Sequence, residues 1–271
     1  MNYIEAIILG ALQGVTEFLP ISSTGHLVFA RELMGLVDQY ALTFDAILHV
    51  ATAVAVLVYF SRSLGELTQT ALRKLGRLPV NKKDETLLYA VLLGTIPAVC
   101  FGLLLESIME TAFRNLLLVA SVMFLGSLLF MYAEWKYYKE PRHSTIDIPL
   151  GIKVGLFQVL ALIPGMSRAG ATIAGGMILG LSRHDATHLS FLLAIPIVVG
   201  AGSKKLLELL LVGNGEVDWF VILAGSVMAF ITALGAIHWL VRFLQRYTLW
   251  VFVWYRILFA VLVTFFVLLG P

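Results

Sequence analysis

Two short polar segments, each placed behind a proline, carry residue types that could bind or transfer a phosphate group. They are 20–26 (PISSTGH) and 164–168 (PGMSR), and an apolar helical run follows each. We expect both to be helix N-termini, where backbone N–H groups and the positive end of the helix dipole favour phosphate. Arg168 adds a permanent positive charge, and its planar guanidinium group suits phosphate oxygens. The predicted phosphate-binding backbone lies at Thr24, Gly25, Gly165 and Gly170.

A carboxylate close to the first segment predicts a cation site or a general base. Glu17 follows Gln13 by four residues, so both side chains project from one face of a helix. Because a carboxylate beside bound phosphate would be repelled, we expect Glu17 to hold a divalent cation or a proton. Glu17 and Gln13 are therefore predicted ligands of Mg²⁺ or Ca²⁺, which take oxygen ligands and share them with substrate phosphates. Glu17 could instead orient or deprotonate a nucleophile, and the candidate nucleophiles are Ser23 and His26.

Three further polar side chains lie within apolar stretches. Asp45 and His49 share one face of such a stretch near its outer end, which places them beside a cavity or among lipid headgroups. Arg256 lies inside the last apolar stretch, where we expect a structural partner or the lining of a cavity. Inserting an arginine into a membrane costs about 2.5 kcal/mol or more, so we assign a function to Arg168 at its segment tip.

The composition places these residues in a membrane. Only 13% of the residues are charged and 59% are hydrophobic, whereas about a quarter of the residues of a soluble domain are charged. The mean hydropathy is +0.91. A net charge of +2 and a single cysteine, Cys100, exclude a basic nucleic-acid-binding arm and a disulfide scaffold. We therefore predict an all-α integral membrane protein that binds no nucleic acid.

Six apolar stretches reach the length of about 20 residues that a membrane-spanning helix needs. They are 40–61, 85–105, 116–135, 186–203, 218–241 and 247–270. Regions 2–37 and 150–181 are too long for one crossing and are broken by the two polar segments, which predicts two re-entrant helical hairpins. Of the 19 Lys and Arg residues, 12 fall on the face that holds 62–83 and 4 on the other. This bias predicts that 62–83 is cytoplasmic and that both termini lie outside.

The two broken regions resemble each other, which predicts an inverted repeat. Segment 12–20 aligns with 157–164 with a one-residue gap, and Ser23 and Ser167 each lie three residues past the proline. Because three spans follow each hairpin, the second copy is inverted, and the two hairpin tips are expected to meet near the membrane midplane. Broken helices in two inverted halves are typical of a binding site. The predicted single membrane domain, 1–271, consists of a first repeat, 1–137, and a second repeat, 148–271.

At these motifs the sequence resembles the undecaprenyl-pyrophosphate phosphatase family, also called the bacitracin-resistance protein family. The motifs are Gln13–His26 and Pro164–Thr172, and the resemblance covers essentially the whole chain. It implies a multi-pass enzyme of the bacterial inner membrane, with its active site open to the outer face. Such an enzyme removes the terminal phosphate of the carrier lipid undecaprenyl pyrophosphate with a divalent cation, and so supports peptidoglycan synthesis and bacitracin resistance. The resemblance implicates as catalytic Glu17, Ser23, His26, Ser167, Arg168 and Thr172.

Two positions depart from the family pattern. Gln13 stands where many members carry a second acidic residue, which weakens any mechanism that needs two carboxylates on the metal. Ala169 stands where serine is common, so a hydroxyl is not essential there. We expect Arg168 and the tip N–H groups to hold the phosphates, Glu17 with Gln13 to place the cation, and Ser23 or His26 to attack or assist.

Two other functions are alternatives to this one. The membrane acid-phosphatase pattern needs a histidine six and an aspartate ten positions after the arginine, and Ala174 and Ile178 occupy those positions. That pattern is therefore excluded. A transporter or lipid flippase shares the inverted-repeat architecture and stays open, since one anion site could bind a lipid headgroup and carry it across. Small-residue runs such as Gly175-Gly176 permit a homodimer, and the sequence determines neither the cation nor the lipid chain length.

Overall fold

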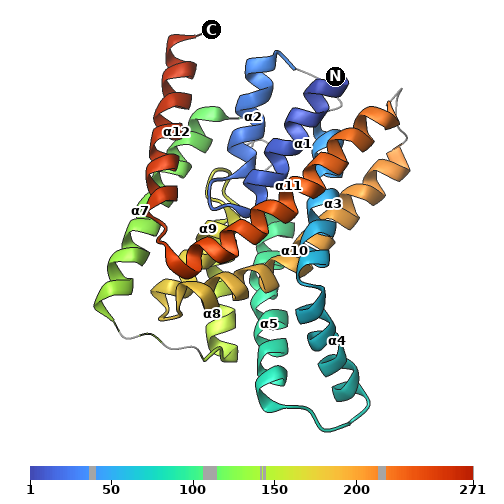
Figure 1. Cartoon of the computed structure of the whole chain (residues 1–271), viewed down its shortest axis with the longest axis vertical. Helices are drawn as coiled ribbons and strands as arrows, with labels where there is room; N and C mark the ends of the chain where they lie inside the picture. The colour runs from blue at the N-terminus through green and yellow to red at the C-terminus, as the bar shows by residue number, and fades with distance from the viewer. Residues whose placement is uncertain (37–40, 106–114, 141, 143–144, 213–217, 271) are drawn as a thin grey trace.

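The computed structural model describes residues 1–36, 41–105, 115–140, 142, 145–212 and 218–270 (Figure 1). The regular elements in these ranges are all helices, as predicted. In chain order they are α1 (Tyr3–Phe18), α2 (Ser23–Met34), α3 (Ala41–Tyr59), α4 (Ser61–Leu75), α5 (Lys82–Leu104), α7 (Leu116–Lys139), α8 (Ile148–Leu160), α9 (Arg168–Ile178), α10 (Arg183–Val212), α11 (Trp219–Arg246) and α12 (Trp250–Leu269). Residues 37 and 40, which bound the predicted first hairpin and first span, lie outside the described residues.

Five helices of the described chain are long and apolar enough to cross a membrane. They are α5, α7, α11, α12 and the part of α10 from Arg183 to Lys204, and each coincides with a predicted span. The remaining predicted span became α3, which meets the same test only together with α4, and the two helices are bent by 77°. The chain is therefore a multi-pass helical membrane protein with five or six candidate spans.

Both predicted hairpin regions consist of two helices broken at the predicted polar segments. The second helix of each pair begins behind a serine in the left-handed backbone region: Ser22 has φ 73° before α2, and Ser167 has φ 71° before α9. In both caps the serine Oγ accepts a hydrogen bond from the N–H three residues on, at Gly25 and Gly170 respectively. A left-handed backbone is uncommon at residues other than glycine, so each break is a tight reversal that its cap holds in place.

These caps correct the predicted alignment of the two segments. Counting from the prolines pairs Ser23 with Ser167, but the caps pair Ser22 with Ser167 and therefore Ser23 with Arg168. The second break is one residue longer between its proline and its cap. Gly165, with φ 99°, takes up that extra residue in a conformation that glycine adopts without strain.

The first helix of each broken pair packs closely along a spanning helix. Helix α1 lies along α11, and α8 lies along α5. A Cβ added at Gly10 of α1 would lie 2.1 Å from the carbonyl oxygen of Gly225, and one added at Gly155 of α8 would lie 1.9 Å from that of Gly94. Both helix pairs therefore depend on glycine for a close backbone approach, as is common in membrane helix packing.

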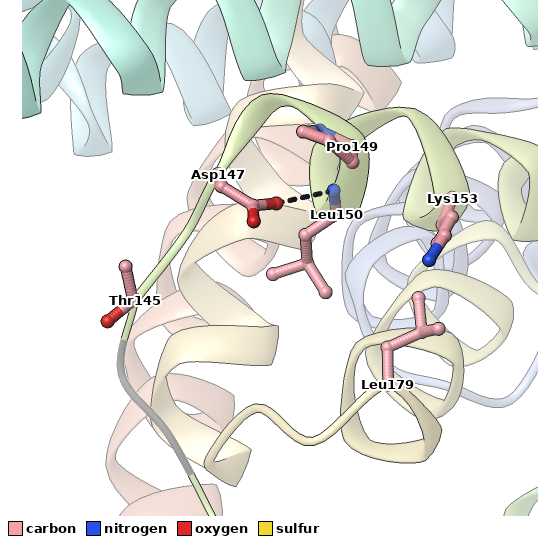
Figure 2. Close-up of a pocket in the computed structure, with 6 residues that line it drawn as sticks. All are labelled: Thr145, Asp147, Pro149, Leu150, Lys153 and Leu179. Atoms are coloured by element: carbon pink, nitrogen blue, oxygen red, sulfur yellow. Dashed lines mark hydrogen bonds between the residues drawn. The ribbon is translucent and has the colours of Figure 1, made fainter.

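Both ends of the chain lie toward the end of the molecule opposite the α4–α5 connection. In Figure 1 the start of α1 and the end of α12 are at the top of the molecule, and the loop between α4 and α5 is at the bottom. A pocket at the start of α8 is lined by Thr145, Asp147, Pro149, Leu150, Lys153 and Leu179 (Figure 2). Asp147 caps α8 there, because its Oδ1 accepts the Leu150 N–H at 2.8 Å. None of the predicted site residues lines this pocket.

Replacing Gly10 with alanine is expected to destabilise the protein. The added methyl group forces α1 away from α11, and overpacking of this kind costs about 1–3 kcal/mol. The thermal unfolding temperature of the detergent-solubilised Gly10→Ala protein should therefore fall. Gly235→Ala is the matched control, because a Cβ on that α11 glycine meets open space. Equal unfolding temperatures for the two variants would contradict the packing role of Gly10.

Candidate active site

The carboxylate of Glu17 joins the two broken helix pairs. Its Oε1 accepts a hydrogen bond from Arg168 Nη2 at 2.8 Å. Its Oε2 accepts hydrogen bonds from Ser23 Oγ at 2.7 Å and from Gln13 Nε2 at 3.1 Å. Four of the predicted site residues, which come from α1, α2 and α9, therefore form one cluster. We refer to Gln13, Glu17, Ser23 and Arg168 as the Glu17 cluster.

Local structure explains why these side chains converge. Gln13 and Glu17 are one turn apart on the last turns of α1, as their spacing predicts. Ser23 is the first residue of α2 and Arg168 the first residue of α9, so both occupy the same position after a capping serine. The two tight reversals thus direct equivalent positions toward one carboxylate, one bringing a hydroxyl group and the other a positive charge.

The ion pair at the centre of the cluster is largely removed from solvent. The side chains of Glu17 and Arg168 are 10% and 14% exposed. Burying two charges is costly, and their attraction offsets that cost only when the hydrogen bonds are well formed. Removing one partner leaves an uncompensated buried charge, so each residue holds the other in place.

His49 of α3 adds an imidazole to the cluster. Its Nδ1 lies 3.0 Å from Gln13 Nε2 and 3.6 Å from Glu17 Oε2. Because a carboxylate only accepts hydrogen bonds, Gln13 Nε2 must be the donor to Glu17, and His49 Nδ1 then accepts from the same amide group. At 43% exposure, the His49 side chain is much more open than that of Glu17.

In the sequence, the spacing of four residues between Asp45 and His49 indicates that they share a helix face. It does not indicate that His49 contacts Glu17. The structure separates the two roles. Asp45 forms an ion pair with Arg31 of α2, whereas His49 reaches the Glu17 cluster.

His26 is turned toward α12. Its Nδ1 lies 2.7 Å from the carbonyl oxygen of Ser22, and its Nε2 lies 2.7 Å from the hydroxyl group of Tyr255. The ring also stacks on Phe259, with 4.1 Å between centroids. One ring nitrogen is thus bound to the cap of α2 and the other to α12, and none of these contacts reaches Glu17.

Ser167 and Thr172 support the second tip. Ser167 Oγ donates to the carbonyl oxygen of Leu19 at 3.4 Å, which links the two tips. Thr172 Oγ1 donates to the carbonyl oxygen of Arg168 at 2.8 Å and lies 2.5 Å from Ser190 Oγ, so it fixes the first turn of α9 against α10. Neither hydroxyl contacts Glu17.

The predicted phosphate-binding backbone is partly engaged within the protein. The N–H groups of Gly25 and Gly170 donate to the capping serines rather than pointing into an anion site. The carbonyl oxygen of Gly165 accepts a hydrogen bond from Arg256. Thr24 is the second residue of α2 and is half-buried. The capping hydroxyls thus engage two of the four backbone N–H groups that were predicted to bind phosphate, because an N-cap serine satisfies the N3 donor.

Arg256 of α12 holds both tips at once. Its guanidinium group is fully buried and donates to the carbonyl oxygens of Pro20 at 3.4 Å in the first tip, and of Gly165 and Met166, both at 3.0 Å, in the second. It also donates to the carbonyl oxygen of Met123 in α7. The expectation that Arg256 is a structural partner is therefore confirmed. The acceptors at Pro20, Gly165 and Met166 belong to backbone that the breaks leave outside the helices.

The oxygen atoms of the Glu17 cluster are suitable ligands for a hard divalent cation. The carboxylate of Glu17 and the hydroxyl group of Ser23 are oxygen ligands. Gln13 is fully buried, and its Oε1 has no hydrogen-bond partner, so an amide oxygen is also available. Within the described residues, no group of three or more His, Cys, Asp and Glu side chains gathers. The protein would therefore supply few ligands, as is usual where substrate phosphates complete the coordination of Mg²⁺.

The fold and the cluster together define a multi-pass helical membrane protein with an arginine–carboxylate–serine site. The chain belongs to the family described as bacitracin resistance protein BacA, whose family model matches residues 6–262.

Curated relatives match over the full length of the chain. A protein of Alteromonas mediterranea is 39% identical over 267 residues, which cover 98% of this chain and 99% of the relative. Proteins of Colwellia psychrerythraea and Rubrobacter xylanophilus are 40% and 39% identical and cover 99% of this chain and 100% of each relative. All three relatives are named undecaprenyl-diphosphatase.

Replacing Arg256 with methionine is expected to lower the stability of the protein strongly. The substitution preserves much of the buried volume but leaves the tip carbonyl groups without a donor, at about 1–3 kcal/mol for each group. Thermal unfolding of the solubilised protein measures this loss, and Arg256→Lys should restore part of it. Arg242→Met, at an exposed position of α11, is the control. An Arg256→Met protein as stable as this control would show that Arg256 does not hold the tips.

Proposed function

We propose that this protein hydrolyses undecaprenyl pyrophosphate at the Glu17 cluster, releasing the terminal phosphate and leaving undecaprenyl phosphate. The reaction recycles the carrier lipid for cell-wall synthesis and confers resistance to bacitracin. One observation carries the assignment of the site: Ser23 Oγ and Arg168 Nη2 lie 2.7 and 2.8 Å from the two oxygens of a single carboxylate. The nucleophile Ser23, the base Glu17 and the phosphate-binding guanidinium group of Arg168 are thereby close enough to act on the same phosphoryl group.

Ser23 is the nucleophile in this proposal, and Glu17 is its general base. The hydrogen bond from Ser23 Oγ to Glu17 Oε2 already has the geometry for proton transfer. As Oγ bonds to the terminal phosphorus, the bond from phosphorus to the bridging oxygen breaks and the hydroxyl proton passes to Glu17. Undecaprenyl phosphate leaves. Water then attacks the phosphoserine, so that inorganic phosphate departs and Ser23 regains its proton.

Arg168 binds the phosphates and stabilises the charge of the transferring group. Its guanidinium group has five N–H donors, of which one is bound to Glu17 at 2.8 Å. When Glu17 accepts the proton of Ser23 it loses its negative charge, so its hold on Arg168 weakens and the guanidinium group is free to bind the phosphate oxygens more strongly. Charge stabilisation of this kind is the main contribution of a protein to phosphoryl transfer.

Gln13 and Glu17 hold a divalent cation, Mg²⁺ or Ca²⁺, in this proposal. When bound, the cation would neutralise charge on the two phosphates of the substrate. The protein's own part is to present the Glu17 carboxylate and the Gln13 amide from one face of α1, one turn apart.

The fold underlying this site is proposed to be six spans and two re-entrant hairpins arranged as an inverted repeat, with repeats 1–137 and 148–271. Three features support it. The caps at Ser22 and Ser167 are alike. The packing of α1 on α11 matches that of α8 on α5, glycine contacts included. In Figure 1, α1 starts in the upper part of the molecule and α8 in the lower half, as two hairpins entering from opposite sides would.

The membrane in question is proposed to be the bacterial inner membrane, with both termini outside and the site open to the outer face. The excess of Lys and Arg in and beside 62–83 supports this orientation. The common position of the two chain ends, opposite the α4–α5 loop, supports it as well. Lipid around the spans would supply the substrate tail with an apolar path to the cluster.

Replacing Arg168 with alanine is expected to lower phosphate release about 10³-fold or more, since an arginine on a transferring phosphoryl group contributes that much. The assay measures phosphate liberated from undecaprenyl pyrophosphate by the full-length protein in detergent, where hydrolysis proceeds and transport across a membrane does not. Arg168→Lys should recover only part of the activity, because it lacks the planar fork.

Arg246→Ala, at the exposed end of α11, is the control for this series, and thermal unfolding shows whether each variant is folded. A folded Arg168→Ala protein with full activity would refute the role of Arg168.

Substituting Ser23 with alanine is expected to abolish a phosphoenzyme that the wild-type protein forms. Rapid quenching of the reaction with substrate labelled at the terminal phosphorus should trap an acid-stable phosphoserine, and Ser23→Ala should carry no label. A label that persists in Ser23→Ala and is lost in acid would instead assign the nucleophile to a histidine.

A further inference from the structure

We infer that His49 is a nitrogen ligand of the divalent cation at the Glu17 cluster, and that this site therefore favours Mn²⁺ over Mg²⁺ and Ca²⁺. The inference rests on the proposed function, in which Gln13 and Glu17 hold the cation. Four polar groups from three helices carry it: two on α1, Ser23 on α2 and His49 on α3.

Three of the groups, Gln13, Ser23 and His49, surround the Oε2 atom of the fourth, Glu17. Gln13 Nε2 lies 3.1 Å from Glu17 Oε2 and 3.0 Å from His49 Nδ1, and those two atoms are 3.6 Å apart. Ser23 Oγ lies 2.7 Å from the same Glu17 oxygen. Adjacent ligands of an octahedral ion with bonds of about 2.1 Å lie about 3 Å apart. The separations at the cluster are therefore close to those of a coordination shell.

Rotation of the Gln13 amide would let the same residues hydrogen-bond to one another without the ion and coordinate the ion when it binds. Its NH₂ group donates to both Glu17 and His49, while Oε1 points away into a fully buried setting without a partner. A half-turn of the amide exchanges the two atoms and brings the oxygen to the point where Glu17 Oε2 and His49 Nδ1 converge. A buried carbonyl oxygen without a partner is costly, and a bound cation would satisfy it.

Imidazole nitrogen changes which cation the site prefers. Mg²⁺ and Ca²⁺ take oxygen ligands, whereas affinity for divalent transition metals rises when nitrogen donors are present. Position 13 supplies a neutral amide, so Glu17 is the one carboxylate of the cluster and attraction for a hard ion is limited. At 43% exposure, the His49 side chain is also the more open of the pair that it forms with Glu17, which is 10% exposed.

Electron paramagnetic resonance with Mn²⁺ as the probe tests this inference without substrate. The full-length protein in detergent is titrated with Mn²⁺ alone, and the spin-echo spectrum of the bound ion is examined for coupling to a directly bound ¹⁴N nucleus. We expect this coupling in the wild-type protein and its loss in His49→Gln. The affinity for Mn²⁺ should fall about tenfold or more in that variant, and the affinity for Mg²⁺, measured by competition, much less.

The matched control is His238→Gln. His238 is an exposed histidine of α11 whose Nδ1 lies 3.3 Å from the hydroxyl group of Tyr59, and its substitution should leave the Mn²⁺ spectrum unchanged. Persistence of the nitrogen coupling in His49→Gln, or its absence from the wild-type protein, would overturn the inference.

Glu17→Gln separates this inference from the proposed function. Loss of Mn²⁺ binding in Glu17→Gln together with loss of the nitrogen coupling in His49→Gln supports both. Loss in Glu17→Gln with an unchanged spectrum in His49→Gln overturns only the role of His49. Unchanged Mn²⁺ binding in Glu17→Gln overturns the proposed cation site itself.

Discussion

The ion pair between Glu17 and Arg168 is the constraint on which the arrangement of this molecule depends. Each charge is largely buried, at no more than 14% exposure. Neither could remain ionised there alone at reasonable cost, and the partner of each lies 151 positions away in the chain. The two broken helix pairs must therefore meet. Where they meet, a serine hydroxyl group and an amide group fill the remaining hydrogen-bonding positions of the carboxylate.

The breaks that allow the two helix pairs to meet leave backbone groups without the hydrogen bonds that a continuous helix would provide. Each break leaves N–H and C=O groups without helical partners, and in a membrane such groups must find partners within the protein. The Ser22 and Ser167 hydroxyl groups each accept a hydrogen bond from one of these N–H groups. Arg256, from α12, donates to carbonyl groups of both tips. A single buried guanidinium group thus stabilises the two tips, whose contact includes a second guanidinium group, that of Arg168, in its ion pair with Glu17.

The two halves use one local design for different ends. Equivalent positions after the caps hold Ser23 in one half and Arg168 in the other, so one tip carries the hydroxyl group and the other the positive charge. Gln13 and its sequence counterpart Gln158 are both buried. Gln13 hydrogen-bonds to Glu17 and His49, whereas neither amide atom of Gln158 has a hydrogen-bond partner. The two tips thus share a similar cap but carry different side chains where they meet.

The sequence alone predicted the features that depend on neighbours within one helix. The apolar spans, the two breaks, a helix N-terminus behind each break, and the shared face of Gln13 and Glu17 all follow from local hydrophobicity and helical spacing. Only the tertiary structure decided that Ser22, rather than Ser23, corresponds to Ser167, that His49 joins Glu17, and that His26 faces Tyr255. Those outcomes depend on how helices approach and rotate against one another, which a glycine contact or one extra residue in a turn can change. No spacing along a single helix carries that information.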